Sequence, residues 1–459
     1  MPTNRKVPHT LVVLFGMIAF AYVLTWLLPA GSFETVVDAA GREVVVPGTF
    51  ALRPDTPHLP FWSMFTVIPR GLAAGQSVIF FVLIIGGTLA IIRSTGAIDA
   101  AVASLLTTFG SRPALLISIG MLGFAAGSST MGLGTEYIPL AALLLMLSAG
   151  LRLDAVAVAA IMVVGYSLGF GTAVSSPTTT LVAQQLASLP PISGAGFRIA
   201  IFAPFLLLGF RHVWRYAKRV REMPSASLVA DIPEAQPGAP GAHVEISRLH
   251  VAVLWMTLGA LALIFWGIIE HDWYLNELGG VFVALAILVG LVARQSLDTM
   301  ARTFTAGAAS LTGTALLIGF ARSIELMLSD GRVLHTLVSG LAAPLAEIGG
   351  ELSAVGMLFI HITLDFFIPS GTAQAYLTIP LMAPIGDLVG VSRQTAVLAF
   401  QMGDGVMNMI APANATLMGI LGICGIPYGR WLRFIWPLIA QLIVVASAAL
   451  IVAVTIGYQ

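Results

Sequence analysis

Charged side chains and cysteine are both scarce in this sequence. Asp, Glu, Lys and Arg make up 10% of its 459 residues, whereas a soluble domain carries about 25% because it needs them to cover its surface. A chain with so little charge has too little polar surface to fold in water. The net charge is zero, which argues against nucleic acid as a partner. Cys424 is the single cysteine, which excludes an internal disulfide and any Cys-based metal cluster.

Apolar residues are abundant instead. They make up 58% of the chain, and the mean hydropathy is +0.94. About 20 consecutive apolar residues suffice to cross a bilayer as a helix. The first run, 11–28, is longer than the apolar part of a signal peptide, so we expect a membrane helix there. The apolar runs lie near residues 10–29, 77–93, 113–150, 153–189, 199–217, 249–270, 275–293, 312–328, 351–389, 394–424 and 433–456. They predict an all-α, multi-pass membrane protein.

Basic residues set the expected orientation, because loops rich in Lys and Arg stay in the cytoplasm. The strongest cluster comprises Arg211, Arg215, Lys218, Arg219 and Arg221. The other basic positions fit the same side only if 113–150 is a re-entrant hairpin that enters from the cytoplasm. The segment 351–389 then enters from outside. This arrangement predicts a cytoplasmic N-terminus and an extracytoplasmic C-terminus.

Short patterns recur along the chain at nearly constant spacing. They are Ser-Thr-Gly at 94–96 with Ser-Asp-Gly at 329–331, Pro177 with Pro412, and Ile-Pro-Leu at 138–140 with 379–381. The first two pairs are 235 residues apart and the third is 241 apart. Since the charge pattern gives the two copies opposite orientations, we expect two inverted repeats, which are typical of secondary transporters.

Each copy has the same expected plan of a helix, an amphipathic connector, a re-entrant hairpin, a broken helix and a final helix. Gly, Pro, Ser and Thr place the hairpin tips at 127–130 and 369–372, and the helix breaks at 169–177 and 403–412. The expected domains are 1–60, an N-terminal membrane helix and extracytoplasmic loop; 61–217, the first inverted repeat; 218–248, a cytoplasmic linker; 249–295, connecting membrane helices; and 296–459, the second inverted repeat.

Two tips and two breaks that meet in mid-membrane would line a wet cavity, because non-helical backbone survives at that depth only where it is buried or hydrated. Helix N-termini at such a cavity suit a carboxylate. The alternative is that Gly and Ser merely allow close helix packing. The candidate substrate-binding residues are Ser129, Thr130, Glu136, Thr178, Ser370, Gly371, Thr372, Gln374, Asp404, Asn408 and Asn414. Hydroxyl and amide groups that suit Na⁺ are Ser128, Ser175, Ser176, Thr372, Asn408 and Thr416.

Acidic residues at membrane depth point to function because burying them is costly. Glu136 follows the first tip, Asp365 precedes the second, and Asp404 sits in the second break. The alternative for Asp404 is a backbone-capping role. His361 and Asp365 share a helix face at i,i+4 and either relay a proton or form a structural hydrogen bond. Glu136, His361, Asp365 and Asp404 are therefore the candidates for proton coupling. Arg322 and Glu325, three residues apart, are expected to neutralise each other.

Several motifs resemble one transporter family. Pro-Ser-Gly-Thr-Ala-Gln-Ala at 369–375 resembles the hairpin signature of the C4-dicarboxylate anaerobic carrier family, in particular its YfcC-like branch. Gly403-Asp404-Gly405 with Asn408 and Pro412 resembles the same branch, as do Gly-Ile-Pro-Tyr-Gly at 425–429, Pro-His-Thr at 8–10 and Pro-Ala-Gly-Ser-Phe-Glu at 29–34. The likeness spans nearly the whole chain.

The resemblance implies an ion transporter superfamily fold in the bacterial cytoplasmic (inner) membrane. It implies a homodimer whose hairpins and broken helices move like an elevator against a scaffold. Family members are associated with C4-dicarboxylates and amino acids. The chain departs from the family pattern at two places. Relatives usually have paired acids where this chain has Thr135-Glu136, and an uncharged residue, often Asn, where it has Asp365. Both departures lie beside the proposed site.

The prediction is therefore a non-enzymatic secondary transporter for a small carboxylate-bearing metabolite, either an amino acid or a dicarboxylate. Na⁺ or H⁺ is the coupling ion, and no cofactor is expected. One rival is an intramembrane aspartyl protease that uses Asp365 and Asp404 as a dyad. However, Gln401 occupies the place of the first Gly in the Gly-x-Gly-Asp motif. The second rival is a passive channel, since inverted repeats also occur in channels.

Overall fold

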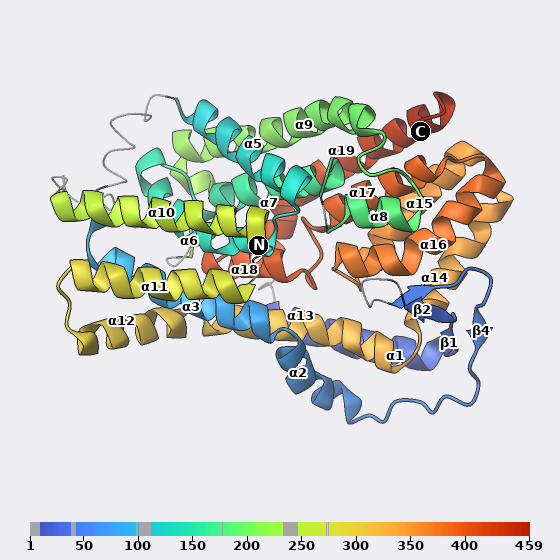
Figure 1. Cartoon of the computed structure of the whole chain (residues 1–459), viewed down its shortest axis with the longest axis horizontal. Helices are drawn as coiled ribbons and strands as arrows, with labels where there is room; N and C mark the ends of the chain where they lie inside the picture. The colour runs from blue at the N-terminus through green and yellow to red at the C-terminus, as the bar shows by residue number, and fades with distance from the viewer. Residues whose placement is uncertain are drawn as a thin grey trace, which may run out of the picture.

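The computed structural model describes residues 10–37, 43–97, 100, 112–176, 178–232, 247–271, 273 and 275–459. This part of the chain is mostly helical (Figure 1). The helices are α1 (Thr10–Leu27), α2 (Ser63–Ala74), α3 (Gln76–Ser94), α5 (Pro113–Met131), α6 (Ile138–Leu151), α7 (Ala155–Gly171), α8 (Thr180–Leu186), α9 (Ala195–Glu222), α10 (Arg248–His271), α11 (Leu275–Val292), α12 (Leu297–Ser310), α13 (Thr312–Asp330), α14 (Leu334–Ala342), α15 (Gly350–Asp365), α16 (Gly371–Val389), α17 (Arg393–Met407), α18 (Ala415–Ile423) and α19 (Tyr428–Thr455).

Five of the described helices are long and apolar enough to cross a membrane: α3, α5, α9, α11 and α19. A sixth crossing results if α12 and α13, which meet at a bend of 44°, form one span. Because these helices expose large apolar side chains, among them Leu207 and Trp436, they need lipid around them. The chain is therefore a multi-pass membrane protein.

Four short strands follow α1, so the expectation of an all-α chain is wrong for this loop. Gly31–Ser32 (β1) pairs antiparallel with Ala51–Leu52 (β4), and Thr35–Val37 (β2) pairs with Glu43–Val45 (β3). Runs of β-branched valine favour such extended backbone. The strands are held beside α14 by a hydrogen bond from the Phe33 N–H to His335 Nδ1. On their other side, β3 packs against α16.

Both predicted hairpins are pairs of helices joined by a short turn, α5–α6 and α15–α16. The first tip, predicted at 127–130, is wrong because those residues lie inside α5. The turn begins at Gly132, whose φ of 71° is left-handed and ends the helix. A 3₁₀ turn, Thr135–Tyr137, then leads into α6. The second turn agrees with its prediction, and the Ser370 side chain caps α16 by accepting from the Ala373 N–H.

Both predicted helix breaks are present as gaps between helices, but each begins later than predicted, because 169–171 belong to α7 and 403–407 to α17. The first separates α7 from α8, and the second separates α17 from α18. Pro177 lies outside the described residues. Asp404 was predicted in unwound backbone, but it lies in the last turns of α17, where its carbonyl accepts from the Asn408 N–H at 2.9 Å. Asn414 closes the second break by capping α18 through the Leu417 N–H.

The two halves share one order of helices. The pairs α2–α3, α5–α6 and α7–α8 precede α9, and the pairs α12–α13, α15–α16 and α17–α18 precede α19. Packing between the halves is reciprocal: α2 contacts α13 while α3 contacts α12, and α8 contacts α16 while α6 contacts α18. Such an exchange of partners is what a two-fold rotation between two copies produces. The opposite orientation of the copies in a membrane stays a prediction.

Two glycines allow a close backbone contact between the halves. Gly405 in α17 lies against Gly171 at the end of α7, and a Cβ on Gly405 would stand 2.4 Å from the Gly171 Cα and N atoms. The Ser167 carbonyl oxygen would be 2.7 Å from the same Cβ. A side chain cannot fit at such distances, so only glycine lets the two backbones approach this closely.

The predicted linker begins as a continuation of α9, which extends to Glu222. The next described residues lie against the helices rather than free of them. Ser227 Oγ donates to Asp154 Oδ2 at 2.6 Å, and Arg430 pairs with Asp231 at 2.9 Å. Residues 233–246, the rest of the predicted linker, lie outside the described residues.

Candidate functional site

Both hairpin turns contact the first helix break. A Cβ on Gly132 would stand 2.5 Å from Thr178 Oγ1 and 2.9 Å from Ser176 Oγ. From the other hairpin, Thr372 Oγ1 donates to the Thr178 carbonyl at 2.6 Å. These contacts bring three predicted site residues, Ser176, Thr178 and Thr372, together with Gly132 of the first hairpin turn.

Asp404 joins this group from the second half. A Cβ on Gly371, the first residue of α16, would stand 2.9 Å from Asp404 Oδ1 and 2.9 Å from Thr179 Cγ2. The N-terminus of α16 therefore lies against the Asp404 carboxylate, and the partial positive charge of that helix end stabilises an anion there. Asp404 itself is 3% exposed, so its charge is shielded from bulk water.

A chain of amides extends the site into the second break. Asn408 Nδ2 donates to Asp404 Oδ2 at 3.2 Å, and Asn414 Nδ2 donates to Asn408 Oδ1 at 2.5 Å. Tyr166 of α7 fixes the backbone by donating to the Asn408 carbonyl at 3.2 Å. Because Asn414 also caps α18, the ends of α16 and α18 are both linked to Asp404 through short contacts.

Asp365 and His361 lie in α15, which packs against α17, the helix of Asp404. The structural hydrogen bond predicted between these two side chains is not formed. Both are fully buried at 0% exposure. Both Asp365 oxygens and both His361 ring nitrogens lack a hydrogen-bond partner among the described residues. Gln374 donates to the His361 carbonyl at 2.9 Å, but its own side-chain oxygen also has no partner among them.

Glu136 lies in the turn of the first hairpin, where both of its oxygens have donors from that turn. The Gly134 N–H donates to Oε2 at 2.7 Å, and Thr135 Oγ1 donates to Oε1 at 3.3 Å. A carboxylate that accepts from its own backbone in this way holds a turn in shape. The contacts of Glu136 therefore indicate a structural role alongside the predicted binding role.

We expect Glu136→Gln to keep substrate uptake within about threefold of wild type, because the glutamine oxygen still accepts from Gly134. Glu136→Ala removes both acceptors and should lower the unfolding midpoint of the purified protein by several degrees, since an unsatisfied buried N–H costs about 1–3 kcal/mol. Uptake and thermal unfolding of the two variants check this. A Glu136→Gln protein that is folded but inactive would show that transport needs the charge of Glu136.

The hydroxyl groups of the first hairpin and first break that were predicted to bind Na⁺ or substrate are largely engaged with backbone. Ser128 donates to the Leu133 carbonyl at 2.6 Å, Thr130 to Ala126 at 2.7 Å and Ser175 to Thr130 at 3.3 Å. Ser129 Oγ accepts from the Val174 N–H at 3.1 Å. The bonds of Ser175 and Ser129 link the first hairpin to the first break, whereas those of Ser128 and Thr130 lie within the hairpin. Thr416 lies across from Gly134, whose added Cβ would be 3.9 Å from its hydroxyl.

Two residues that sequence reasoning missed also belong to the site. Gln401 of α17 donates to the Ala173 carbonyl at 2.9 Å and to Thr180 Oγ1 at 2.5 Å, so it bridges the two halves at the first break. Thr179 contacts Gly371 and donates to Ser176 Oγ at 2.9 Å. The repeat could have revealed Thr179, because it lies 235 residues before Asn414.

A pocket of about 400 Å³ reaches the second hairpin turn from the side of the short strands. It is lined by Ser370 and Thr372 of the site and by His335 of α14. Glu325 also lines it and is paired with Arg322 at 2.6 Å, as expected. The pocket therefore offers a route between one surface and the α16 N-terminus.

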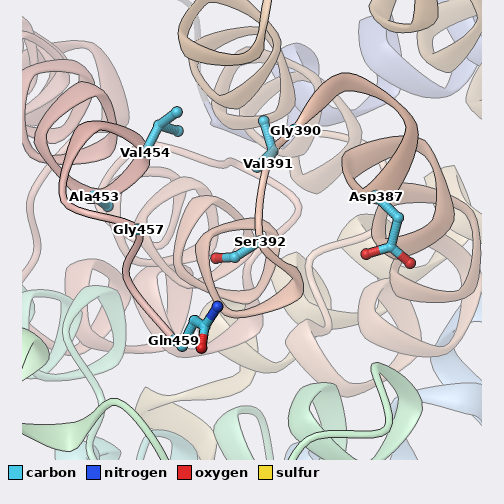
Figure 2. A pocket seen from close by; sticks show the side chains of 8 residues that line it. All are labelled: Asp387, Gly390, Val391, Ser392, Ala453, Val454, Gly457 and Gln459. Atoms are coloured by element: carbon cyan, nitrogen blue, oxygen red, sulfur yellow. The ribbon is translucent and has the colours of Figure 1, made fainter.

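A second pocket, of about 320 Å³, lies away from this site (Figure 2). It is formed by the C-terminal end of α16, the turn that follows and the end of the chain. Asp387, its acidic residue, is paired with Arg393 at 2.8 Å. Since Asp387 is 16 residues from Gly371 along α16, roughly 24 Å at 1.5 Å per residue, this pocket is separate from the Asp404 group.

Similarity to solved structures is weak. The YdaH transporter of Alcanivorax borkumensis aligns over 98% of this chain and 99% of its own, with 16% identity and a TM-score of 0.41. MtrF of Neisseria gonorrhoeae aligns over 98% and 95%, with 18% identity and a TM-score of 0.41. At this level the superpositions carry no argument about fold or mechanism.

Sequence relatives cover the full length. The Escherichia coli K12 protein named "Putative basic amino acid antiporter YfcC" is 30% identical over 100% of this chain and 98% of its own. A Haemophilus influenzae Rd protein is 24% identical over 98% and 97%. The family model described as C4-dicarboxylate anaerobic carrier matches residues 7–455. With a membrane-embedded helical fold, this near-complete match shows that the chain belongs to the C4-dicarboxylate anaerobic carrier family of transporters.

Proposed function

We propose that the protein is a secondary active transporter for a small carboxylate-bearing metabolite that also has a cationic group, as an amino acid does. The observation that carries the proposal is the contact between the N-terminus of α16 and the buried Asp404 carboxylate. The free N–H groups of helix ends bind a carboxylate, while Asp404 attracts a cation. Both charges of an amino acid would thus find partners within one small region.

A C4-dicarboxylate is the second candidate, and the family description favours it. Its second carboxylate would face Asp404, so that acid would have to bind a proton or Na⁺ during transport. The two candidates therefore differ in what Asp404 holds. An amino acid needs the Asp404 charge, whereas a dicarboxylate needs it neutralised.

We propose H⁺ as the coupling ion and Asp365 as its carrier, with His361 beside it. A carboxylate buried without a hydrogen-bond donor is far less stable than the neutral acid or a carboxylate with a bound cation. Among the residues that the structure describes, Asp365 has no donor, whereas Asp404 has Asn408 as donor. Because α15 packs against α17, a change in the charge of Asp404 as substrate binds or leaves would alter the proton affinity of Asp365 and so couple proton and substrate.

An elevator movement in a homodimer is part of the proposal and is supported by family membership. The reciprocal packing of the halves also supports two related repeats. Proteolysis by an Asp365–Asp404 dyad is disfavoured, because the two carboxyls are 0% and 3% exposed and a peptide bond has no access to them. A channel is disfavoured because both hairpin turns contact the first break directly, as moving gates would.

Uptake into proteoliposomes tests this function. Labelled arginine, a neutral amino acid and succinate are each supplied with an imposed H⁺ or Na⁺ gradient. We expect saturable accumulation of an amino acid under the H⁺ gradient, and loss of that drive in Asp365→Asn while exchange of the substrate persists. Accumulation of succinate alone would replace the amino acid, and accumulation under Na⁺ alone would replace the proton. Flux that never saturates would instead support a channel.

A further inference from the structure

A groove between α9 and α19 collects positive charge away from the substrate site. The two helices pack against each other along one edge of the molecule (Figure 1). The groove encloses about 360 Å³ and is lined by Arg211, Arg215 and Arg219 of α9 and by Arg433 of α19. His212 Nε2 contacts the Phe434 carbonyl at 3.0 Å, so a direct contact between the two helices fixes the floor of the groove.

These four arginines form no ion pair with an acid in the part of the chain that the structure describes. The nearby acids are occupied elsewhere. Asp154 accepts from Tyr216, Ser227 and the Ala157 N–H. Asp231 pairs with Arg430, and Glu222 lies 3.8 Å from Lys218. Four unneutralised guanidinium groups around one concave surface repel one another, and an anion with several oxygens would relieve that repulsion.

Next to the groove, the exposed side chains of the same two helices are apolar. Leu207, one helical turn before Arg211, is 65% exposed, and Trp436, three residues after Arg433, is 61% exposed. In a membrane protein such side chains face lipid, and tryptophan lies at the level of the headgroups. The groove therefore sits where the lipid-facing surface meets the basic end of α9. A ligand there would meet cations at one end and hydrocarbon at the other.

We propose that this groove binds the phosphate headgroup of an anionic phospholipid in the cytoplasmic leaflet, with the acyl chains along α9 and α19. Guanidinium groups bind phosphate oxygens in a bidentate manner, and basic pockets between membrane helices suit anionic headgroups. A free phosphate ion would satisfy the cations but gain nothing from the apolar surface. The site is independent of the transported substrate.

Thermal unfolding of the purified full-length protein in neutral detergent tests the site. Phosphatidylglycerol should raise the unfolding midpoint in a saturable manner, while phosphatidylcholine with the same acyl chains and inorganic phosphate should not. Arg211→Gln/Arg433→Gln removes one cation from each helix and should weaken the apparent affinity about 30-fold, since each basic group is worth about 1 kcal/mol. Lys218→Gln/Arg248→Gln removes the same charge outside the groove and should stay within about threefold.

Equal losses in the two double variants would overturn the proposal, because binding would then follow net charge alone. Phosphatidylcholine as effective as phosphatidylglycerol would also overturn it, and the same shift with inorganic phosphate would make the groove a site for a soluble anion. Should the groove variant fail to fold, a photoreactive phosphatidylglycerol gives an independent test on the unaltered protein. It should label peptides from α9 and α19, and labelling confined to other helices would contradict the assignment.

Discussion

Replacing Asp404 with asparagine should abolish gradient-driven uptake, lowering its initial rate roughly 100-fold or more. Losing one partner of a buried charged contact costs about 2–5 kcal/mol, and 2.7 kcal/mol corresponds to 100-fold. Asparagine has nearly the same shape and keeps an oxygen that accepts from Asn408. The variant should therefore fold, so its defect reports on binding or coupling. Initial uptake rates and the unfolding midpoint, measured on the same preparation, check both statements.

Asp387→Asn is the matched control for this change. Asp387 lies in the same half of the chain but is 45% exposed and paired with Arg393 at the far end of α16. Exposed pairs of this kind are worth little, about 0–1 kcal/mol. Uptake by Asp387→Asn should stay within twofold of wild type. Wild-type uptake by Asp404→Asn would remove the acid from the transport mechanism and leave the capping role that the sequence also allowed.

Gly405→Val should largely prevent folding. The added Cβ alone would overlap the Gly171 backbone at 2.4 Å, and valine adds two further methyl groups at this backbone contact between the halves. Overpacking in a core costs about 1–3 kcal/mol when side chains can shift, and here the neighbour is backbone, which cannot. We expect a loss of monodisperse protein in size-exclusion chromatography, or a midpoint more than about 10 °C below wild type.

Gly123→Val provides the comparison for that loss. Gly123 lies in α5, and no atom is within 4 Å of the Cβ that would be added to it. The substitution changes helix propensity by only a few tenths of a kcal/mol, so yield and midpoint should stay close to wild type. A Gly405→Val protein as stable as Gly123→Val would mean that α7 and α17 are not in contact as described.

The sequence predicted the hairpins and breaks because Gly, Pro and Asn interrupt the apolar helices. Ser370 and Asn414 are helix caps, which is the use such residues commonly have. The first tip was misplaced by its hydroxyl-rich residues. The Thr130 hydroxyl donates to the Ala126 carbonyl one turn earlier, as Thr can in a membrane helix, and the helix continues to Met131. Glycine conformation, rather than polarity, decided where the turn falls.

The candidate site could be predicted in composition but not in contacts. Asp404, Thr178, Gly371 and Thr372 were identified from sequence and lie together in the structure. Gln401 was considered only as a mismatch to a protease motif, although it bridges both halves through the first break. No local pattern marks such a residue, because its partners are more than 200 positions away. The short valine strands were missed for a simpler reason, since a polar, Pro-containing loop gave no membrane signal.

Cys424 has a practical consequence that follows from its position. It is the only thiol in the sequence, and in α18–α19 packing it is fully buried at 0% exposure. Water-soluble maleimides react with accessible thiolates, so they should not modify Cys424 in the folded protein. Spin labels or fluorophores can therefore be attached to a pair of introduced cysteines in the otherwise natural chain. Distances between the turn at Ser370 and the short strands can then be followed without first removing a residue that packs behind the second break.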